Sequence, residues 1–221
     1  MRRNPHPISL SISDAVAGSV RLGQVSASSV RVRESTQALL DEMQEVANRL
    51  ADRYEGRPPA EIIELRPARE LYRSFGIDPT KTRPSSEALL RRALKRKPLP
   101  RIINAVDLCN LLSLRFLLPI GLYDTEKIEI EDDGAVLLRR GEPGESYTGI
   151  RKADVHLEGR PVLIDRRGPF GNPTSDSLRT SVDASTTSLW MVIFAPASVP
   201  SETMEANVGL ARESMARHLS P

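Results

Sequence analysis

Hydrophobic residues recur at helical spacing through the middle and the end of the chain. Between Ser35 and Tyr54 they follow one another at intervals of three and four residues, which places them on one face of a helix. Ser35 or Thr36 can cap the start of this helix, and Gly56 followed by Pro58 ends it. This stretch is the clearest helix that the sequence predicts.

The same spacing predicts three more helices. They cover Pro59 to Phe75, with a bend at Pro67, a stretch that opens at Ser85, and Ser201 to Leu219. A serine is a favourable N-cap, and basic residues crowd the end of the helix that opens at position 85, where they match the negative end of the helix dipole.

The stretch from Ile102 to Leu117 differs from these because it is apolar nearly all round. Such a helix is expected to be buried on every side. Asp107, Asn110 and Ser113 stand three residues apart in it, and that spacing forms one narrow polar stripe. The sequence therefore predicts a buried helix that carries a few polar side chains.

Short β-like runs lie before and after the helices. Residues 8–33 alternate weakly, as two or three strands would, and the later runs are separated by Gly, Pro and Asp turns. Strands, then helices, then strands indicate an α+β fold, and 221 residues suit a single domain over residues 1–221. The later runs are Lys127–Ile130, Ala135–Arg139, Pro161–Asp165 and Leu189–Phe194.

Charge and cysteine content exclude few classes of function. The chain has 31 basic and 29 acidic residues, and a formal charge of +2 does not by itself indicate a nucleic-acid partner. The single cysteine, Cys109, excludes an internal disulfide framework and a cysteine-based zinc cluster. There is neither a phosphate-binding glycine motif nor a nucleophile elbow, so we expect no cofactor and no metal. We also see no signal segment and no run of membrane length, which predicts a cytoplasmic chain.

Five basic residues lie close together at the end of the helix that opens at Ser85. They either contact the phosphates of a tRNA or form a solvated helix end that matches the dipole. No aromatic stacking platform accompanies them. These residues are Arg91, Arg92, Lys95, Arg96 and Lys97.

Five motifs follow one another in the second half of the chain. They are Val106-Asp107-Leu108-Cys109-Asn110, Leu118-Pro119-Ile120-Gly121-Leu122-Tyr123-Asp124, Leu138-Arg139-Arg140-Gly141 with Gly144-Glu145, Val162-Leu163-Ile164-Asp165, and Gly171-Asn172-Pro173-Thr174-Ser175-Asp176. In this order and approximate spacing they resemble the tRNA-editing domain of the phenylalanyl-tRNA synthetase β chain. The resemblance covers residues 71–196, and residues 1–58 are only weakly covered.

The resemblance implies a mixed β-sheet or barrel-like core flanked by helices. In the synthetase this domain hydrolyses tyrosine that is wrongly attached to the phenylalanine tRNA. The aminoacylation core and the anticodon-binding domain of the synthetase cannot fit in 221 residues. The resemblance therefore implies a freestanding aminoacyl-tRNA hydrolase for translation quality control, with tRNA as its partner, and not a ligase.

The resemblance also implies a substrate pocket. Asn110 matches a pocket asparagine whose amide can orient a ligand, and Cys109 stands where the synthetase often has threonine. Gly121 stands where the bacterial synthetase usually has histidine. Asp176 matches, one methylene shorter, the glutamate that reads the tyrosine hydroxyl, and Glu145 is either a pocket residue or a loop anchor. No catalytic side chain is assigned, because a positioned water and well-aimed dipoles can hydrolyse a labile aminoacyl ester.

Three functions are compatible with these residues. The first is a trans-acting deacylase of mischarged tRNA. The second is a protein that binds a free amino acid or a similar small metabolite without catalysis, which the changes at Cys109 and Gly121 would suit. The third is an interaction module with an apolar stripe between Ser35 and Phe75 as its partner surface, although packing on the chain's own core explains the stripe more simply.

Overall fold

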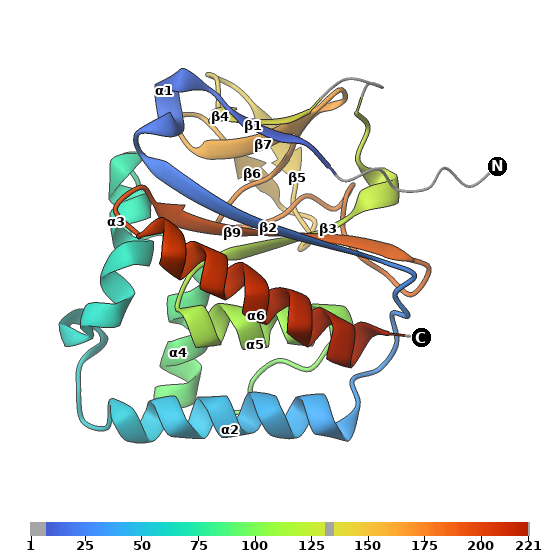
Figure 1. The fold of residues 1–221 in the computed structure, drawn as a ribbon. Coiled ribbons are helices and arrows are strands. Elements are labelled where there is room, and N and C mark those ends of the chain that lie inside the picture. The colour runs from blue at the N-terminus through green and yellow to red at the C-terminus, as the bar shows by residue number, and fades with distance from the viewer. Residues whose placement is uncertain (1–7, 131–134, 221) are drawn as a thin grey trace.

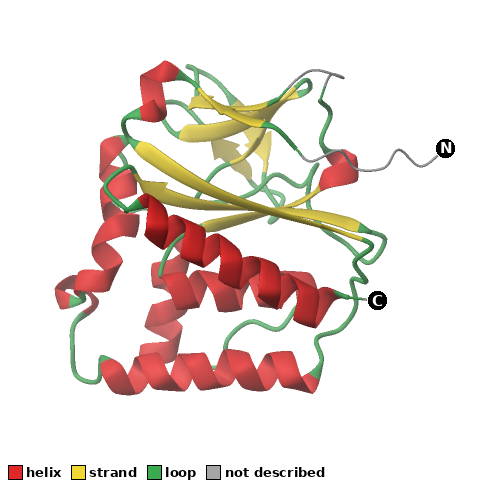
Figure 2. Cartoon of the chain, in the orientation of Figure 1, coloured by secondary structure: helices red, strands yellow, loops and turns green. Residues whose placement is uncertain are grey.

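The structure, a computed structural model, describes residues 8–130 and 135–220. Strands gather in the upper half of the view in Figure 1 and most helices in the lower half, and Figure 2 shows the same separation by colour. A three-stranded sheet lies between the other strands and the helices. This central sheet therefore has a helical face and a face that meets further strands.

The central sheet has the strand order β2-β9-β3, and both neighbouring pairs are antiparallel. All nine residues of β9 are buried. Successive side chains of a strand point to opposite faces, so β9 contributes to two cores: Met191 packs with the helices and Trp190 packs toward the second sheet. The strands are β2 (Val20–Ser28), β3 (Ile120–Asp124) and β9 (Ser188–Pro196).

Leucine-rich helices cover the lower face of the central sheet. In Figure 1, α5 (Asn104–Phe116) and α6 (Ser201–Leu219) lie next to the sheet, and α2 (Gln37–Arg53) and α4 (Ser85–Leu94) pack against α5 below them. The apolar stripe of α2 is buried in this core, so it does not form an exposed partner surface. The short helix α3 (Arg66–Ser74) packs against β9.

A second sheet lies on the other face and has the order β1-β4-β7-β8, with β1 and β4 parallel and the other pairs antiparallel. The core between the two sheets is rich in aromatic side chains. A separate hairpin consists of β5 (Ser146–Thr148) and β6 (Asp154–His156), and the short helix α1 (Asp14–Ala17) joins β1 to β2. The second sheet comprises β1 (Leu10–Ile12), β4 (Val136–Arg140), β7 (Pro161–Asp165) and β8 (Gly168–Gly171).

The α+β class predicted from the sequence is confirmed. The helices expected from Ser35, from Ser85, over 102–117 and over Ser201–Leu219 are present, and Thr36 caps α2 by accepting the Leu39 N–H. The described strands form separate sheets and close into no barrel. The expectation of a barrel-like core is therefore not confirmed.

The predicted strand from Lys127 to Ile130 is wrong. Thr125–Lys127 is a short 3-10 turn, and the backbone after it joins no sheet. The Glu129 N–H donates a 2.9 Å hydrogen bond to the Asp165 carboxylate. A side chain thus takes a backbone donor that a strand ladder would have used.

The predicted bend at Pro67 is also wrong. Two 3-10 turns, Pro59–Glu61 and Ile63–Leu65, precede α3, and Pro67 lies in the first turn of that helix. Proline suits this position because the N–H that it lacks would be unpaired there anyway. The valines at positions 30 and 32 form no third strand and are buried in the helical core instead.

Candidate functional site

A tight turn joins α5 to β3 and holds the helix against the strand. Leu117 ends α5 in the left-handed conformation, with φ at 54°. Ser113 Oγ donates a 2.7 Å hydrogen bond to the Leu118 carbonyl oxygen, and the Cys109 thiol donates to the Ile120 carbonyl oxygen at 3.7 Å. Cys109 is thereby placed beside the strand that carries Gly121.

Tyr123 fills space between the two sheets that two glycines leave open. It is fully buried, and its ring contacts Phe170 edge-on and Trp190 at a tilt, with centroid distances of 5.1 and 5.7 Å. A Cβ atom on either Gly121 or Gly171 would lie 2.6 Å from Tyr123 Cζ. Non-bonded carbons do not approach so closely, so both glycines are required for Tyr123 to occupy this position.

The loop that follows β8 carries the predicted residue Asp176. Asn172 Oδ1 accepts the backbone N–H groups of Thr174 at 2.7 Å and Ser175 at 2.9 Å, which forms an Asx turn. Asn172 Nδ2, however, is buried without a hydrogen-bond partner among the described residues. The turn therefore leaves one buried donor unused.

Two tyrosines from distant elements anchor this loop. Tyr72 on α3 donates a 3.0 Å hydrogen bond to the Pro173 carbonyl oxygen, and Tyr147 on β5 donates to the Ser175 carbonyl oxygen. Burial raises the pKa of Tyr72 to about 12, although Thr174 and the nearby positive charge of Arg160 oppose the rise. The backbone around Asp176 is thus held by side chains that sequence reasoning did not select.

Asp176 has one paired and one unpaired carboxyl oxygen. Oδ2 accepts the Leu122 N–H on β3 at 3.2 Å, whereas Oδ1 is buried and has no partner among the described residues. The residue as a whole is partly exposed, so the carboxyl lies just below the surface. Burial raises the pKa of Asp176 to about 7, and the nearby Tyr123 hydroxyl and the Leu122 N–H offset only part of that rise. The Tyr123 hydroxyl is itself buried without a hydrogen-bond partner among the described residues, although it lies near enough to Asp176 to affect the pKa of that carboxyl.

Several buried groups respond to the Asp176 charge. Burial first, and then this charge, raise the pKa values of Cys109, Tyr123 and Tyr147 well above their usual ranges. A thiol that stays protonated is a poor nucleophile, so Cys109 contributes shape and a weak donor. We refer to Cys109, Tyr123, Tyr147, Asn172 and Asp176 as the Asp176 cluster.

Asn110 follows Cys109 on α5 and is half-buried. Its amide makes no side-chain hydrogen bond to any of the described residues. The capping that an asparagine often performs is carried out here by Asn104, which accepts the Arg33 N–H at 3.0 Å and donates to the Arg31 carbonyl oxygen at 2.9 Å. The Asn110 amide therefore keeps its donors and its acceptor for another partner.

Glu145 is engaged in a loop contact. Arg139 donates two hydrogen bonds to its carboxylate, at 2.8 and 2.5 Å, and the Glu142 N–H donates a third at 2.7 Å. The bonds from Arg139 lower the pKa of Glu145 more than burial raises it. None of these bonds involves the Asp176 cluster. They therefore favour a role for Glu145 as a loop anchor over a role as a pocket residue.

Three of the five basic residues at the end of α4 bond to the chain itself. Arg91 and Arg96 form ion pairs with carboxylates, and Arg92 donates to a backbone carbonyl oxygen. Within the part of the chain that the structure describes, only Lys95 and Lys97 of the five have no side-chain partner, and both are exposed. These contacts favour a structural role for the arginines.

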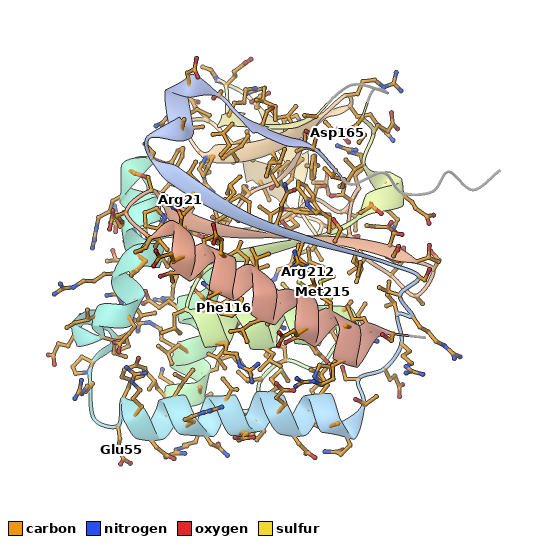
Figure 3. The ribbon with its side chains drawn as sticks, in the orientation of Figure 1. Arg21, Glu55, Phe116, Asp165, Arg212 and Met215 are labelled. Carbon is orange, nitrogen blue, oxygen red and sulfur yellow. The ribbon has the colours of Figure 1, made fainter. Side chains whose placement is uncertain are left out.

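An open pocket of about 300 Å³ lies elsewhere, between the end of β2 and α6. Its lining includes Arg212 and Met215, which Figure 3 shows on α6, whereas Asp165 lies on the far side of the central sheet. The pocket shares no lining residue with the Asp176 cluster. Over residues 8–130 and 135–220, no group of three His, Cys, Asp or Glu side chains is placed to hold a metal ion. No helix in these ranges is long and apolar enough to cross a membrane.

The sequence profile of the B3/4 domain matches residues 67–218, which is more than half of the chain. The chain therefore belongs to the B3/4 domain family. A stretch of 97 residues is 33% identical to the phenylalanine–tRNA ligase β subunit of Streptomyces avermitilis, and it covers 43% of this chain and 11% of that protein. The chain is thus related to the phenylalanyl-tRNA synthetase β chain and spans about a tenth of the length of this relative.

Among solved structures, an N-terminal fragment of the phenylalanyl-tRNA synthetase β subunit from Pyrococcus horikoshii is similar to this chain. The TM-score is 0.48 and the sequence identity is 12%, over 96% of this chain and 49% of that fragment.

Proposed function

We propose that this chain is a trans-acting aminoacyl-tRNA deacylase and that the Asp176 cluster, together with Asn110, receives the aminoacyl group. The observation that carries the proposal is the Asp176 carboxyl, which has a buried oxygen without a partner among the described residues and lies near other buried groups that also have none. Buried polar groups are nearly always hydrogen-bonded. Unpaired groups on Asp176, Tyr123 and Asn172 therefore favour a site that binds a polar ligand, and the relation to the synthetase β chain supports an aminoacylated tRNA as that ligand.

Hydrolysis of an aminoacyl ester requires little beyond the correct placement of a water molecule and the ester. A carboxyl that titrates near neutral pH is suited to general-base catalysis, and burial gives Asp176 a pKa of about 7. In the proposed step, the Asp176 carboxylate takes a proton from water while the water oxygen attacks the ester carbonyl carbon. The tetrahedral intermediate then collapses, and the ribose hydroxyl leaves with that proton. The unpaired amide of Asn110 can hold the amino or carbonyl group of the substrate in place.

Deacylation of charged tRNA tests this proposal. The substrates are tRNAs that carry alanine, serine, tyrosine or meta-tyrosine, and the variants are Asn110→Ala and Asp176→Asn. We expect each variant to lose on the order of 100-fold in kcat/KM on the substrate that wild type prefers. The exposed residues Asn48 and Asp154 provide matched controls, Asn48→Ala and Asp154→Asn, which should retain activity. Folded wild-type protein that leaves every charged tRNA as stable as buffer does would refute the proposal.

A second candidate is a protein that binds a free amino acid or a similar small metabolite at the same site without catalysis. It is favoured by the absence of a side chain at Gly121 and by the neutral thiol of Cys109, which leave few reactive groups. It predicts a rise in Tm with an amino acid in the absence of tRNA, together with no deacylation. A rise in Tm that accompanies turnover would instead support the deacylase.

The exposed end of α4 is the proposed contact for tRNA phosphates, through Lys95 and Lys97. Because neither side chain has a partner among the described residues, the double variant Lys95→Glu/Lys97→Glu should raise KM for charged tRNA without changing kcat. A double variant whose KM equals that of wild type would show that tRNA does not bind at Lys95 and Lys97.

A further inference from the structure

Two arginines occupy neighbouring positions in the second sheet, near the end of α3. Arg140 is the last residue of β4, and Arg160 directly precedes β7, the strand that pairs with β4. The Gly141 N–H donates a 2.8 Å hydrogen bond to the Arg160 carbonyl oxygen. The backbone therefore brings the two arginines together from segments that are about twenty positions apart in the chain.

Arg140 is held in place by uncharged groups. Its Nη1 donates a 2.8 Å hydrogen bond to the Gly159 carbonyl oxygen, and its guanidinium carbon lies 4.8 Å from the centre of the Phe75 ring, at the end of α3. A guanidinium has five N–H donors, and the Gly159 bond uses one of them. The side chain is exposed, so it is fixed in position while donors remain for a further partner.

Arg160 lies beside the loop that carries Asp176. It is half-buried, and its side chain has no hydrogen-bond or ion-pair partner among the described residues. Burial raises the pKa values of Tyr72 and Tyr147, and the positive charge of Arg160 opposes the rise in both. The guanidinium is therefore near the two hydroxyls that anchor the loop. The Asp176 charge acts on Tyr147 as well, so Tyr147 is a neighbour of both Arg160 and Asp176.

Little negative charge from the described residues is available to balance these two guanidinium groups. The C-terminal end of α3 carries about half an elementary negative charge, and Arg73 in its last turn already offsets that. Asp78, which follows the helix, accepts hydrogen bonds from Thr80 instead. Like charges on neighbouring segments repel each other, and a half-buried charge also loses part of its solvation. A bound anion would offset both costs.

We propose that Arg140 and Arg160 form a phosphate-binding site that holds a backbone phosphate of the single-stranded acceptor end of a tRNA. Arginine is well suited to this role because its planar fork of N–H donors matches phosphate oxygens. The identity of the ligand rests on the proposed function, since an acceptor end bound here has its aminoacyl group near Asp176. Lys95 and Lys97 follow α4 in the lower half of Figure 1, whereas β4 and β7 lie in the upper half, so the two sites contact different parts of the tRNA.

Binding of a short RNA tests this site without requiring catalysis. The probe is a fluorescent single-stranded RNA that ends in CCA, and its anisotropy is measured at several salt concentrations. Arg160→Gln should weaken binding by about tenfold or more, because a charge-assisted contact is lost. It should also reduce the steepness of log Kd against log salt concentration by about 0.7, the change expected for one phosphate contact to a single strand. The control is Arg57→Gln, at an exposed arginine that follows α2, which should change neither quantity.

Each other outcome has a definite meaning. If Arg160→Gln does not fold, Arg140→Gln takes its place with the same expected loss. A folded variant whose affinity and salt dependence equal those of wild type overturns the site. Inorganic phosphate that binds wild type as tightly as the RNA does would assign the site to a free anion and overturn the tRNA contact. RNA binding that depends on Arg160, in a protein that hydrolyses no charged tRNA, would refute the deacylase and leave this site standing.

Discussion

The two faces of the central sheet differ in the polar groups that they bury. On the helical face, Leu189 and Met191 of β9 enter a core of aliphatic side chains. On the other face, Trp190 packs beside Tyr123, and the unpaired atoms of the Asp176 cluster lie at the edge of that aromatic core. Local departures from full hydrogen bonding are expected at functional sites, and the recognition role proposed for the Asp176 cluster rests on this difference between the two faces.

Unpaired hydroxyl groups occur on the helical side too, but in a different setting. Among the described residues, the hydroxyls of Tyr54, at the end of α2, and Ser86, at the start of α4, are buried without partners. Among the described residues, Asp176 is the one carboxylate with a buried unpaired oxygen. A carboxyl oxygen without a partner is costlier to bury than a hydroxyl, and this separates Asp176 from Tyr54 and Ser86.

The largest expected effect is a loss of stability from a substitution on the helical face. Leu112→Ala removes a fully buried side chain from α5 and should lower the free energy of unfolding by about 3 kcal/mol, as judged by urea denaturation. Activity per folded molecule should be unchanged. Leu210→Ala on α6 is the control, because Leu210 is 44% exposed and should cost less than about 0.5 kcal/mol. An equal loss in both variants would contradict the aliphatic core as the source of stability.

The next largest effect is a gain in stability from a substitution on the other face of the central sheet, at Asp176. The pKa of Asp176 is raised to about 7, so between about pH 4 and pH 7 the folded state retains a proton that the unfolded state releases. Stability from this group is therefore complete at acidic pH, falls as the pH rises through that window, and stays constant above it.

Asp176→Asn removes this dependence. The variant should equal wild type near pH 4 and be more stable by about 2 kcal/mol above pH 7, less than the full linkage because the residue is partly exposed. At the same time it should lose the proposed activity, as expected where function is maintained at a cost in stability. Urea denaturation at several pH values measures the difference, with Asp154→Asn as the control. A variant that is less stable than wild type at pH 8 would show that Asp176 serves the fold.

The smallest effect concerns a carboxylate of the helical face, with the opposite dependence on pH. Glu42 on α2 accepts hydrogen bonds from Arg115 on α5 at 2.8 Å and from His218 on α6 at 2.9 Å. Burial raises the pKa of Glu42, but these hydrogen bonds together lower it by more than burial raises it. The net shift of the pKa is therefore downward. A lowered carboxyl pKa stabilises the fold above the unfolded value and ceases to do so as the pH falls through the folded value.

Glu42→Gln should cost about 1 kcal/mol at pH 7 and almost nothing in the most acidic conditions in which the protein folds. The exposed residue Glu45 on the same helix provides the control Glu45→Gln. A cost that stays constant with pH would mean that Glu42 acts through its shape and not through its charge.

The sequence predicted the helices better than the strands. An amphipathic helix such as α2 carries its apolar face in a local period that can be read without knowing its neighbours. The strands β3 and β8 have only five and four residues and contain glycines. β9 was recognised because its run of apolar residues is long. The turn at Thr125–Lys127 has a local signal, because Asp124 caps it by accepting the Glu126 N–H, and the distant Arg179 also binds its backbone through the Lys127 carbonyl oxygen.

The candidate site was predicted only in part. Asn110 and Asp176 were selected from the motifs, and the structure leaves Asn110 without a side-chain partner and Asp176 with one unpaired oxygen. No sequence motif marks Tyr147 or Arg160 as part of the site. Their relation to it depends on how the β5–β6 hairpin packs against the loop that carries Asp176. Tyr123 was visible inside a motif, but its role could not be read before β3 was known to turn it toward Gly171.

The sequence by itself determined the α+β class, the helical core and the family relation, because periodicity and motif order are properties of neighbouring residues. Only the tertiary structure decided which polar groups remain unpaired. Pairing in the interior depends on partners from segments far apart in the chain: Leu122 for one oxygen of Asp176, and no described residue for the other. The phenol of Tyr123 beside that oxygen is likewise a consequence of three strands meeting in space.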